Sequence, residues 1–200
     1  MSSLASYYKS LKMKRTFNKK VVQCTIVGDC SVGKTSLVKK FLRAEENIED
    51  VIPTVFDNFS GEVTLEEGES TISIFDTTGD HDFEGLRQLP YVLSNVIVVC
   101  FSVIDRESYN SVSDFWLPEI KKYTKKGTAV VLVATHCDLR NRNLTAVENN
   151  EGVSLAKKIG AYSFIETSTK DVENISKLFE IVVTKVTKKR KNIFSKLFRR

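Results

Sequence analysis

The stretch GDCSVGKT, residues 28–35, matches the pattern G-x-x-x-x-G-K-[ST]. An apolar run over residues 21–27 precedes it, and the residues that follow have the spacing of an amphipathic helix. Between a strand and a helix, the backbone N–H groups of such a stretch and the helix N-terminus form a cradle for phosphate groups. We therefore expect a phosphate-binding loop here. The alternative is a glycine-rich turn that binds nothing.

Two residues of this stretch are candidates for direct chemistry. Lys34 is placed to reach the terminal phosphates of a nucleotide, and the Thr35 hydroxyl is placed to bind Mg²⁺. A second candidate is Asp76, which ends the strand expected over residues 71–76 and has the position of a carboxylate that holds Mg²⁺ through water. Gly79 then leaves a backbone N–H open toward a γ-phosphate. The alternative for Asp76 and Gly79 is a plain turn.

Strand-like and helix-like segments alternate along the rest of the chain. Residues 43–54 are polar and predict a loop, and EEGE at 66–69 predicts a hairpin turn. The expected strands are 21–27, 58–65, 71–76, 96–102, 129–135 and 162–167, and the expected helices are 35–42, 83–93, 106–123, 151–160 and 171–189. This order predicts an α/β fold with a six-stranded, mostly parallel sheet, helices on both faces and ligands beyond the carboxyl ends of the strands.

The composition suits one globular domain in a reducing compartment. A chain of 200 residues can bury a sizeable core, and no apolar run approaches the roughly 18 residues of a transmembrane helix. The first ten residues, MSSLASYYKS, contain neither a secretory h-region nor an initial Met-Gly for myristoylation. The four cysteines, Cys24, Cys30, Cys100 and Cys137, lack metal-ligand spacing, so we expect reduced thiols in the cytosol.

The charge is distributed unevenly. Residues 1–20 contain six Lys or Arg and residues 185–200 contain eight, and neither segment contains an acidic residue. All twenty-five acidic residues therefore lie in residues 21–184, which carry a balance of −9. We interpret the chain as a basic N-terminal extension (1–20), a domain (21–184) and a basic C-terminal tail (185–200). The alternative for residues 1–20 is a solvated terminus.

Five motifs, in the right order, resemble those of the Ras-like small GTPases, and most closely those of their Rho/Rac branch. GDCSVGKTSLV, residues 28–38, resembles the first motif of that branch, and VIPTVFDN, residues 51–58, resembles its switch I. Residues 76–91 resemble switch II and keep its L-R-x-L pattern. THCDLR at 135–140 stands where the branch has T-K-x-D-L-R, and ETSTK at 166–170 stands where it has E-C-S-A.

This resemblance covers about residues 21–184 and implies the P-loop small GTPase fold, with GTP or GDP and Mg²⁺ as ligands. It makes Thr54 a second Mg²⁺ ligand and γ-phosphate sensor, beside Thr35 and Asp76. It makes Asp138 the acceptor for guanine N1 and N2, with Lys34, Gly79 and Asp80 at the catalytic positions. The implied nucleotide-binding residues are Asp29, Cys30, Ser31, Val32, Gly33, Lys34, Thr35, Ser36, Thr54, Gly79, Thr135, His136, Asp138, Ser168 and Thr169.

The resemblance also implies protein partners, namely Rho/Rac-type effectors and exchange factors. Val55, Phe56 and Asp57 would present the effector surface, with Leu86 and Leu89 beside them. For Phe56 and Leu89, packing in the core is the alternative. The segment from 141 to 152 is too short for the additional helix of Rho-branch proteins, so partners that need that helix are not expected.

Three departures from the family cluster where hydrolysis would occur. Asp80 stands where the family has a water-orienting Gln, Cys30 replaces a Gly, and Thr78 replaces an Ala. Asp is shorter than Gln, has no amide donor and repels a γ-phosphate when ionised. We therefore expect GTP hydrolysis to be strongly slowed and poorly rescued by an activating protein. The alternatives are that Asp80 orients water in its own way, or that the site only holds GDP.

The base pocket also departs from the family. Glu46, Asn47 and Ile48 stand where relatives have an aromatic residue, Val51 replaces a Tyr, and His136 replaces a Lys. Each change removes contact with the nucleotide, so we expect nucleotide to leave faster than in typical relatives. For His136 the alternative is a harmless replacement, with the imidazole packing on guanine as the Lys stem does.

The tail lacks the C-a-a-X cysteine of this branch, so prenylation is not expected. On a helix, Ile193, Phe194, Leu197 and Phe198 share one face among basic residues, which predicts peripheral binding to anionic inner membrane leaflets from the cytoplasm. The alternatives are a last helix docked on the core and a nuclear-import or nucleic-acid patch. General nucleic-acid binding is disfavoured by the acidic domain.

Together these patterns indicate a signalling switch of the Rho/Rac type, a group associated with the actin cytoskeleton, that is largely GTP-bound because hydrolysis is impaired. Two alternatives stay open. One is a normally cycling GTPase that uses Asp80 in place of Gln, and the other is a nucleotide-stabilised binding module that never cycles.

Overall fold

The computed structural model describes residues 20–42, 54–66, 68–142 and 144–197. The strands are β1 (Lys20–Val27), β2 (Phe56–Leu65), β3 (Gly68–Thr77), β4 (Val96–Ser102), β5 (Ala129–Thr135) and β6 (Ser163–Glu166). The helices are α2 (Lys34–Phe41), α3 (Glu84–Leu93), α4 (Arg106–Ser111), α5 (Leu117–Tyr123), α6 (Asn149–Ile159) and α7 (Val172–Leu197), with the short helical turns η1 (His81–Phe83), η2 (Val112–Trp116) and η3 (Cys137–Arg142).

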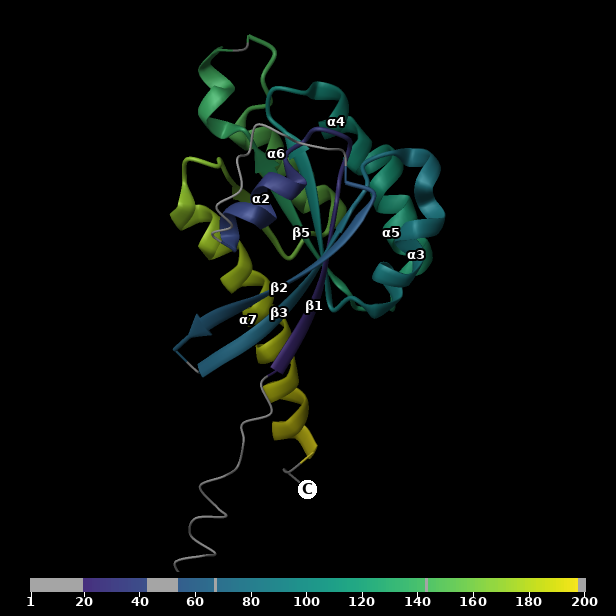
Figure 1. Ribbon diagram of the computed structural model, residues 1–200, viewed down its shortest axis with the longest axis vertical. Helices are drawn as coiled ribbons and strands as arrows, with labels where there is room; N and C mark the ends of the chain where they lie inside the picture. Colours follow the sequence, from purple (N-terminus) through teal and green to yellow (C-terminus); the bar gives the residue numbers. More distant parts are fainter. Residues whose placement is uncertain (1–19, 43–53, 67, 143, 198–200) are drawn as a thin grey trace, which may run out of the picture.

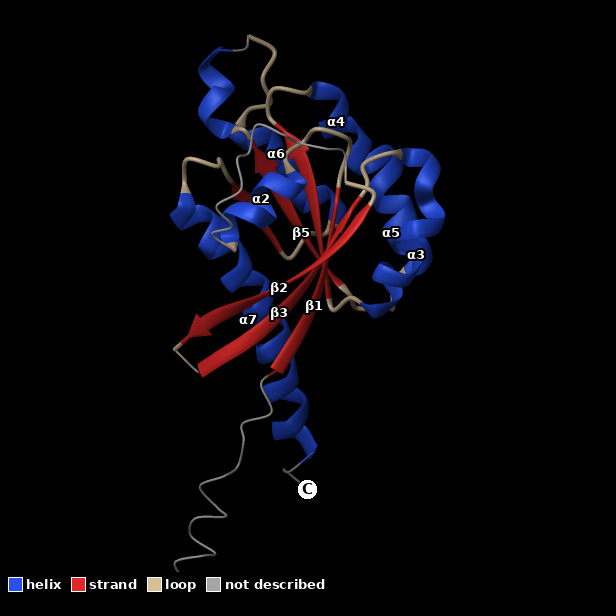
Figure 2. Ribbon diagram, in the orientation of Figure 1, coloured by secondary structure: helices blue, strands red, loops and turns tan. Residues whose placement is uncertain are grey.

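The strands form one six-stranded sheet in the order β2-β3-β1-β4-β5-β6. Only β2 runs antiparallel to its neighbour, because a tight turn joins it to β3, whereas the other neighbouring strands are parallel and joined by helices. Helices lie on both sides of the twisted sheet (Figure 2). The predicted α/β fold with a mostly parallel six-stranded sheet is confirmed.

Each face of the sheet has its own hydrophobic core. On one face, Leu37 and Val38 of α2 and Phe179 of α7 pack on alternate residues of the central strands. On the other face, Tyr91 of α3 and Trp116 of η2 pack with residues of α6 on the intervening strand positions. Because buried parallel strands must be apolar on both faces, β4 is buried along its whole length.

The strand ends determine where the site is. β1, β3, β4, β5 and β6 end at the same edge of the sheet, and four of the five sequence motifs lie at the ends of β1, β3, β5 and β6, whereas the described part of the switch I motif leads into β2. In Figure 1 this edge lies at the top of the molecule, and α7 runs back past the opposite edge to the C-terminus. The fold therefore brings segments that are far apart in the sequence to one edge.

The boundaries differ from expectation in two informative places. The expected helix over 106–123 is interrupted at η2, a π-helical turn, which inserts Phe115 and Trp116 next to the segment that follows β3. The expected last helix over 171–189 continues to Leu197, so α7 crosses the expected boundary at 184/185 without a break. Within the described residues, no helix combines the length and the apolar character needed to span a lipid bilayer.

Candidate functional site

The phosphate-binding loop joins β1 to α2 and is shaped by two glycines. Gly28 has a φ of 141°, and a Cβ there would lie 2.2 Å from the carbonyl oxygen of Cys100 on β4, so no other residue fits. Gly33 has a φ of 85° and lies at the N-cap of α2. The loop therefore needs glycine at both positions to turn sharply between the strand and the helix.

Lys34 folds back over this loop. Its ammonium group is buried and donates hydrogen bonds of 2.8 Å to the carbonyl oxygens of Gly28 and of Asp29. Burial lowers the pKa of Lys34. A phosphate group bound at this loop would give the Lys34 ammonium a negatively charged partner. The two carbonyl oxygens that it contacts here are neutral.

A cation corner forms where α2, the segment before β2 and the end of β3 meet. The Thr35 hydroxyl donates a 2.6 Å hydrogen bond to Asp76 Oδ2 and lies 2.8 Å from the Thr54 hydroxyl. Asp76 is fully buried, burial raises the pKa of its carboxyl group, and its Oδ1 atom has no hydrogen-bond partner among the residues that the structure describes. An orphaned buried carboxylate oxygen beside two hydroxyl groups fits a hard cation such as Mg²⁺.

A cavity of about 410 Å³ opens next to this corner. Its floor is close-packed, because a Cβ on Gly79 would lie 2.3 Å from Asp29 C and Cys30 N of the phosphate-binding loop. Thr77 and Thr78, which the sequence did not single out as ligand contacts, also line it. The lining residues are Cys30, Ser31, Gly33, Lys34, Thr35, Ser36, Thr54, Thr77, Thr78, Gly79 and His136.

Asp80 lies beside the cavity but is not part of its lining. Its carboxylate caps η1 by accepting a 3.0 Å hydrogen bond from Asp82 N. Its backbone N–H donates a 3.1 Å hydrogen bond to the Thr78 hydroxyl. Both hydrogen bonds of Asp80 therefore stabilise the start of switch II, a structural role that the sequence did not suggest.

The Cys30 side chain is exposed and lines the cavity, where the sequence predicted additional side-chain volume.

A buried ion pair holds the backbone of this segment. The guanidinium of Arg87, on α3, makes two hydrogen bonds to Glu119 on α5, at 2.8 and 2.9 Å, and Tyr91 donates a third to the same carboxylate at 2.7 Å. The remaining Arg87 donors reach the carbonyl oxygens of Asp80, at 2.6 Å, and of His81, at 3.2 Å. Arg87 belongs to the L-R-x-L pattern, but its carboxylate partner, Glu119, is 32 residues away in sequence, and no local signal identifies it.

A second contact joins switch II to the phosphate-binding loop through the side chain of Asp29. Asp29 Oδ1 accepts a 2.7 Å hydrogen bond from Trp116 Nε1 and lies 2.9 Å from His81 Nε2. The His81 ring stacks on Phe115, with ring centroids 3.7 Å apart and planes 7° apart. The sequence suggested Asp29 only as a nucleotide contact, whereas here its carboxylate connects three elements.

The expected base-binding motifs meet at the ends of β5 and β6. Asp138 Oδ1 accepts a 2.8 Å hydrogen bond from the Ser168 hydroxyl, and Oδ2 lies 2.8 Å from Lys170 Nζ. The hydrogen bonds from Lys170 and then from Ser168 lower the pKa of Asp138. Thr135 ties this region to the phosphate-binding loop by donating a 2.7 Å hydrogen bond to the carbonyl oxygen of Val32. The Asp138 carboxylate is thus ionised and held in one orientation, which an acceptor for a guanine edge requires.

His136 has a fixed place between the loop and the sheet. It adopts a φ of 58°, its Nδ1 lies 2.9 Å from the Ser102 hydroxyl at the end of β4, and its Nε2 lies next to Gly33. Burial lowers the pKa of His136, so the ring is neutral near pH 7. Ser102, which the sequence did not suggest, orients this ring at the cavity wall.

The expected effector residues lie on the surface. Leu89 is 65% exposed and Val55 is 61% exposed, which rules out core packing for Leu89. Phe56 is 42% exposed, with its ring centroid 5.9 Å from that of Phe75, so it lies over the sheet edge and not within the core. Asp57 and Leu86 are also exposed. Glu46, Asn47, Ile48 and Val51, for which altered base contacts were expected, lie outside the described residues.

Comparison with known proteins agrees with this geometry. The model of the Ras family matches residues 23–188. The chain is 37% identical over 171 residues to the Ras-like GTP-binding protein RhoL of Drosophila melanogaster, a match that covers 85% of this chain and 89% of that protein. The matched range includes all five motifs and every element that contributes to the cavity. The chain therefore belongs to the Ras family of small GTPases.

Proposed function

We propose that the protein is a guanine-nucleotide switch of the Rho/Rac type in which the step that ends the signal, GTP hydrolysis, is impaired. Ras-family proteins bind GTP and GDP, typically with Mg²⁺, and the cavity and cation corner fit these ligands. The Rho/Rac assignment rests on the motif resemblance and on the name of the relative RhoL. The hydrolysis defect rests on the residues next to the cavity.

One observation carries the proposal, namely the position of the Asp80 carboxylate. It accepts the Asp82 backbone N–H, and Arg87 fixes the Asp80 carbonyl, so the residue is held as a helix cap. A carboxylate in this place has no N–H to donate to an attacking water or to a γ-phosphate. Cys30 and Thr78 add side-chain atoms to the lining of the same cavity. Among the described residues, the lining of this cavity includes no Asn or Gln side chain that could replace a water-orienting amide.

The remaining residues support nucleotide binding. Lys34 would exchange its two carbonyl partners for phosphate oxygens, and the loop N–H groups would hold the same phosphates. Thr35, Thr54 and Asp76 would hold Mg²⁺, which supplies charge neutralisation for the phosphates when bound. Because Thr54 lies next to Val55 and Phe56, its position would connect the phosphate end of the nucleotide to the exposed effector surface.

The test is single-turnover hydrolysis of GTP by the purified protein with Mg²⁺, beside a variant that carries Asp80→Gln and Cys30→Gly. We expect the natural protein to be nearly inert and the variant to gain on the order of 100-fold, the effect of one positioned polar group. Asp82→Gln, an exposed neighbour in η1, is the matched control and leaves the rate unchanged.

Two outcomes would contradict the proposal. If the natural protein hydrolyses GTP as fast as the variant, Asp80 is a working substitute for Gln and the protein is a normally cycling GTPase. If a Rho/Rac-type effector domain binds the GDP and GTP forms equally, the protein is a nucleotide-stabilised binding module. We also expect the protein to release labelled GDP fast with Mg²⁺ present and without an exchange factor. Slow release would contradict the expectation that the protein binds GTP without an exchange factor.

The basic tail completes the proposal by placing the switch on the cytoplasmic side of an anionic membrane. Residues 185–200 carry eight basic and no acidic residues, and the tail is helical to Leu197 as a continuation of α7. At about 1 kcal/mol per basic residue near an anionic leaflet, eight could hold the domain reversibly. Full recovery of the protein in the supernatant at low salt, in the presence of anionic vesicles, would contradict this.

A further inference from the structure

A second large cavity lies at the opposite edge of the sheet from the nucleotide site. Its volume is about 400 Å³, close to the 410 Å³ of the nucleotide cavity. It is lined by residues of the second half of α5, of the loop that leads into β5, and of the turn between α6 and β6. It therefore lies where β5 and β6 begin. A cavity of this size is in the range, roughly 300–1,000 Å³, of small-molecule sites.

Of the described residues, four lysines and no acidic residue line this cavity, which we call the lysine pocket. They are Lys121, Lys125, Lys126 and Lys185. The first three are exposed, and Lys185 reaches in from α7 with its Nζ 4.0 Å from the centre of the Tyr162 ring. A cation over an aromatic ring is held in place without being neutralised.

These four ammonium groups differ from other lysines of the domain. Lys122, on the same helix, is paired with Glu84, Lys170 is paired with Asp138, and Lys34 is satisfied by two carbonyl oxygens. Among the residues that the structure describes, no ion pair is recorded for any lysine of the pocket. A domain with nine more acidic than basic residues over 21–184 thus gathers unpaired positive charge in one hollow. The positive charges of the four lysines repel one another, and a bound anion would reduce this repulsion.

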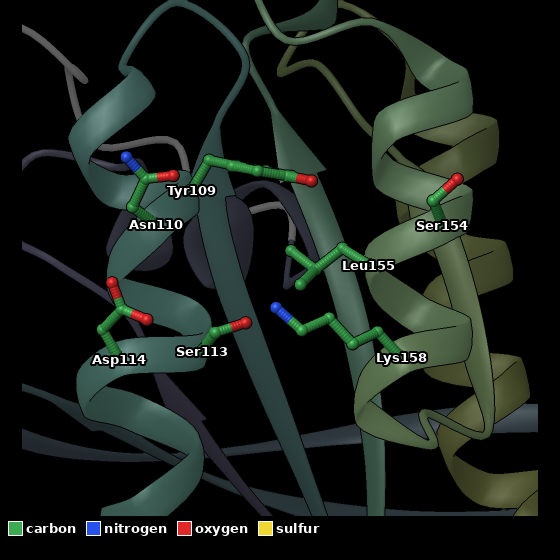
Figure 3. A pocket seen from close by; sticks show the side chains of 7 residues that line it. All are labelled: Tyr109, Asn110, Ser113, Asp114, Ser154, Leu155 and Lys158. Carbon is green, nitrogen blue, oxygen red and sulfur yellow. The ribbon is translucent and has the colours of Figure 1, made fainter.

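A smaller cavity shows that hollows in this protein are not generally basic. It has a volume of about 200 Å³ and lies between α4–η2 and α6 (Figure 3). Its one lysine, Lys158, extends from α6 across the groove toward Ser113, and Asp114 belongs to the same lining. Its lining charges therefore balance, whereas those of the lysine pocket do not.

We propose that the lysine pocket binds a polyphosphorylated anion, presented as the headgroup of a phosphorylated inositol lipid. Lysines bind phosphate as mobile point charges, and four of them suit a ligand with two or more phosphate groups. α7 runs toward one edge of the sheet (Figure 1), and the pocket's lining residues lie at that same edge, where β5 and β6 begin. Residues 185–200 carry eight basic residues. Clusters of Lys and Arg beside a cytoplasmic leaflet attract such headgroups. This inference goes beyond the switch function and does not depend on whether hydrolysis is impaired.

The test is vesicle co-sedimentation of the full chain, loaded with GDP and Mg²⁺. The vesicles are phosphatidylcholine alone, or with phosphatidylserine, or with a bisphosphorylated inositol lipid, the last two matched in total negative charge. The pocket variant is Lys125→Ala with Lys126→Ala. The control variant is Lys157→Ala with Lys177→Ala, which removes the same charge from exposed positions outside the pocket.

We expect the natural protein to prefer the inositol-lipid vesicles, and the pocket variant to lose at least about tenfold in affinity for them. The control variant is expected to lose less than about threefold, because separated exposed charges are screened. Equal losses in the two variants would overturn the proposal, since general charge would then explain the binding. No preference between the two anionic vesicles, together with no binding of soluble inositol trisphosphate, would also overturn it.

A soluble arm identifies the source of the ligand. If inositol trisphosphate binds the natural protein and not the pocket variant, while the two anionic vesicles bind equally, the site stands and its ligand is a soluble polyphosphate. Replacing the basic residues of 189–200 with Gln should weaken binding to both anionic vesicles alike, which separates the tail from the pocket. Unchanged unfolding midpoints and GDP retention confirm that each variant is folded.

Discussion

The residues that would hold the nucleotide and the residues next to the transferred phosphate are arranged in opposite ways. In the first group, protein partners hold each side chain at the cavity or the base site: two carbonyl oxygens hold Lys34, the Thr35 hydroxyl holds Asp76, and Ser168 holds Asp138. In the second group, Asp80 points its carboxylate at its own helical turn and its carbonyl at Arg87. The residues expected to bind nucleotide thus lie together at the cavity and the base site, whereas the Asp80 side chain is fixed as a cap.

Binding and hydrolysis therefore depend on different physical requirements in one cavity. Binding needs donors and a cation corner, which the loop backbone and three side chains supply. Hydrolysis also needs a group free to orient water. Here switch II is held by a buried ion pair, by the contact between Asp29 and Trp116 and by the stacked His81 ring. The predictions below test these two halves separately.

The largest effect is expected from Arg87→Ala, which removes the support of switch II. Glu119 would be left buried without its cation, so the free energy of unfolding should fall by about 3–5 kcal/mol in urea denaturation with saturating GDP. Arg106→Ala, which breaks the exposed pair with Glu151, is the matched control and should cost about 1 kcal/mol or less. Equal losses would mean that the buried network does not hold this half of the site.

Lys34→Ala tests the binding half. Loss of charge-assisted hydrogen bonds at about 1.5–3 kcal/mol each predicts a fall in GDP affinity of about 100-fold, measured with a fluorescent GDP analogue. Lys40→Ala, in the same helix and outside the cavity lining, should change the affinity little. Retention of normal affinity by the Lys34 variant would show that the folded-back ammonium is only a structural contact.

Asp80→Ala is expected to have a local effect that leaves binding intact. Loss of the cap should cost about 1 kcal/mol and speed amide exchange at Asp82, while GDP affinity stays unchanged. Asp80→Asn keeps a capping oxygen and should preserve the slow exchange. If Asp80→Ala weakens GDP binding as Lys34→Ala does, the separation between the two halves fails.

The smallest effect is expected at the base site from Lys170→Met. The hydrogen bonds from Lys170 and then from Ser168 lower the pKa of Asp138 in the folded protein below its ordinary value of 3.8. The Lys170–Asp138 pair therefore stabilises the protein at pH values above 3.8. This contribution is lost as the pH falls through the lower pKa of the folded protein. Because Lys170 is 74% exposed, the difference at pH 7 should be only a few tenths of a kcal/mol. A loss that grows toward low pH, compared with Lys177→Met, would contradict this assignment.

The sequence predicted the sheet, its direction and the general place of the site, because those features follow from local patterns. The strands at 96–102 and 129–135 have the expected bounds, and Thr35 and Asp76 meet as expected because both follow strands that end at one edge. The interruption of the helix at η2 was not predicted, because a π-helical turn has no periodicity signal of its own in a short segment.

The sequence by itself determined the glycine-shaped phosphate loop and the Asp at position 80, since each depends on residue type and near spacing. It also named the three residues of the cation corner, Thr35 and Asp76 from their place at strand ends and Thr54 from the family resemblance. Only the tertiary structure decided that Asp80 is a cap, that Glu119 lies against Arg87, that Trp116 reaches Asp29 across 87 positions, and that four lysines from two helices and a loop share one pocket. The physical reason is that these contacts join segments distant in sequence. Packing on the two faces of the sheet brings those segments together, and no local pattern records it.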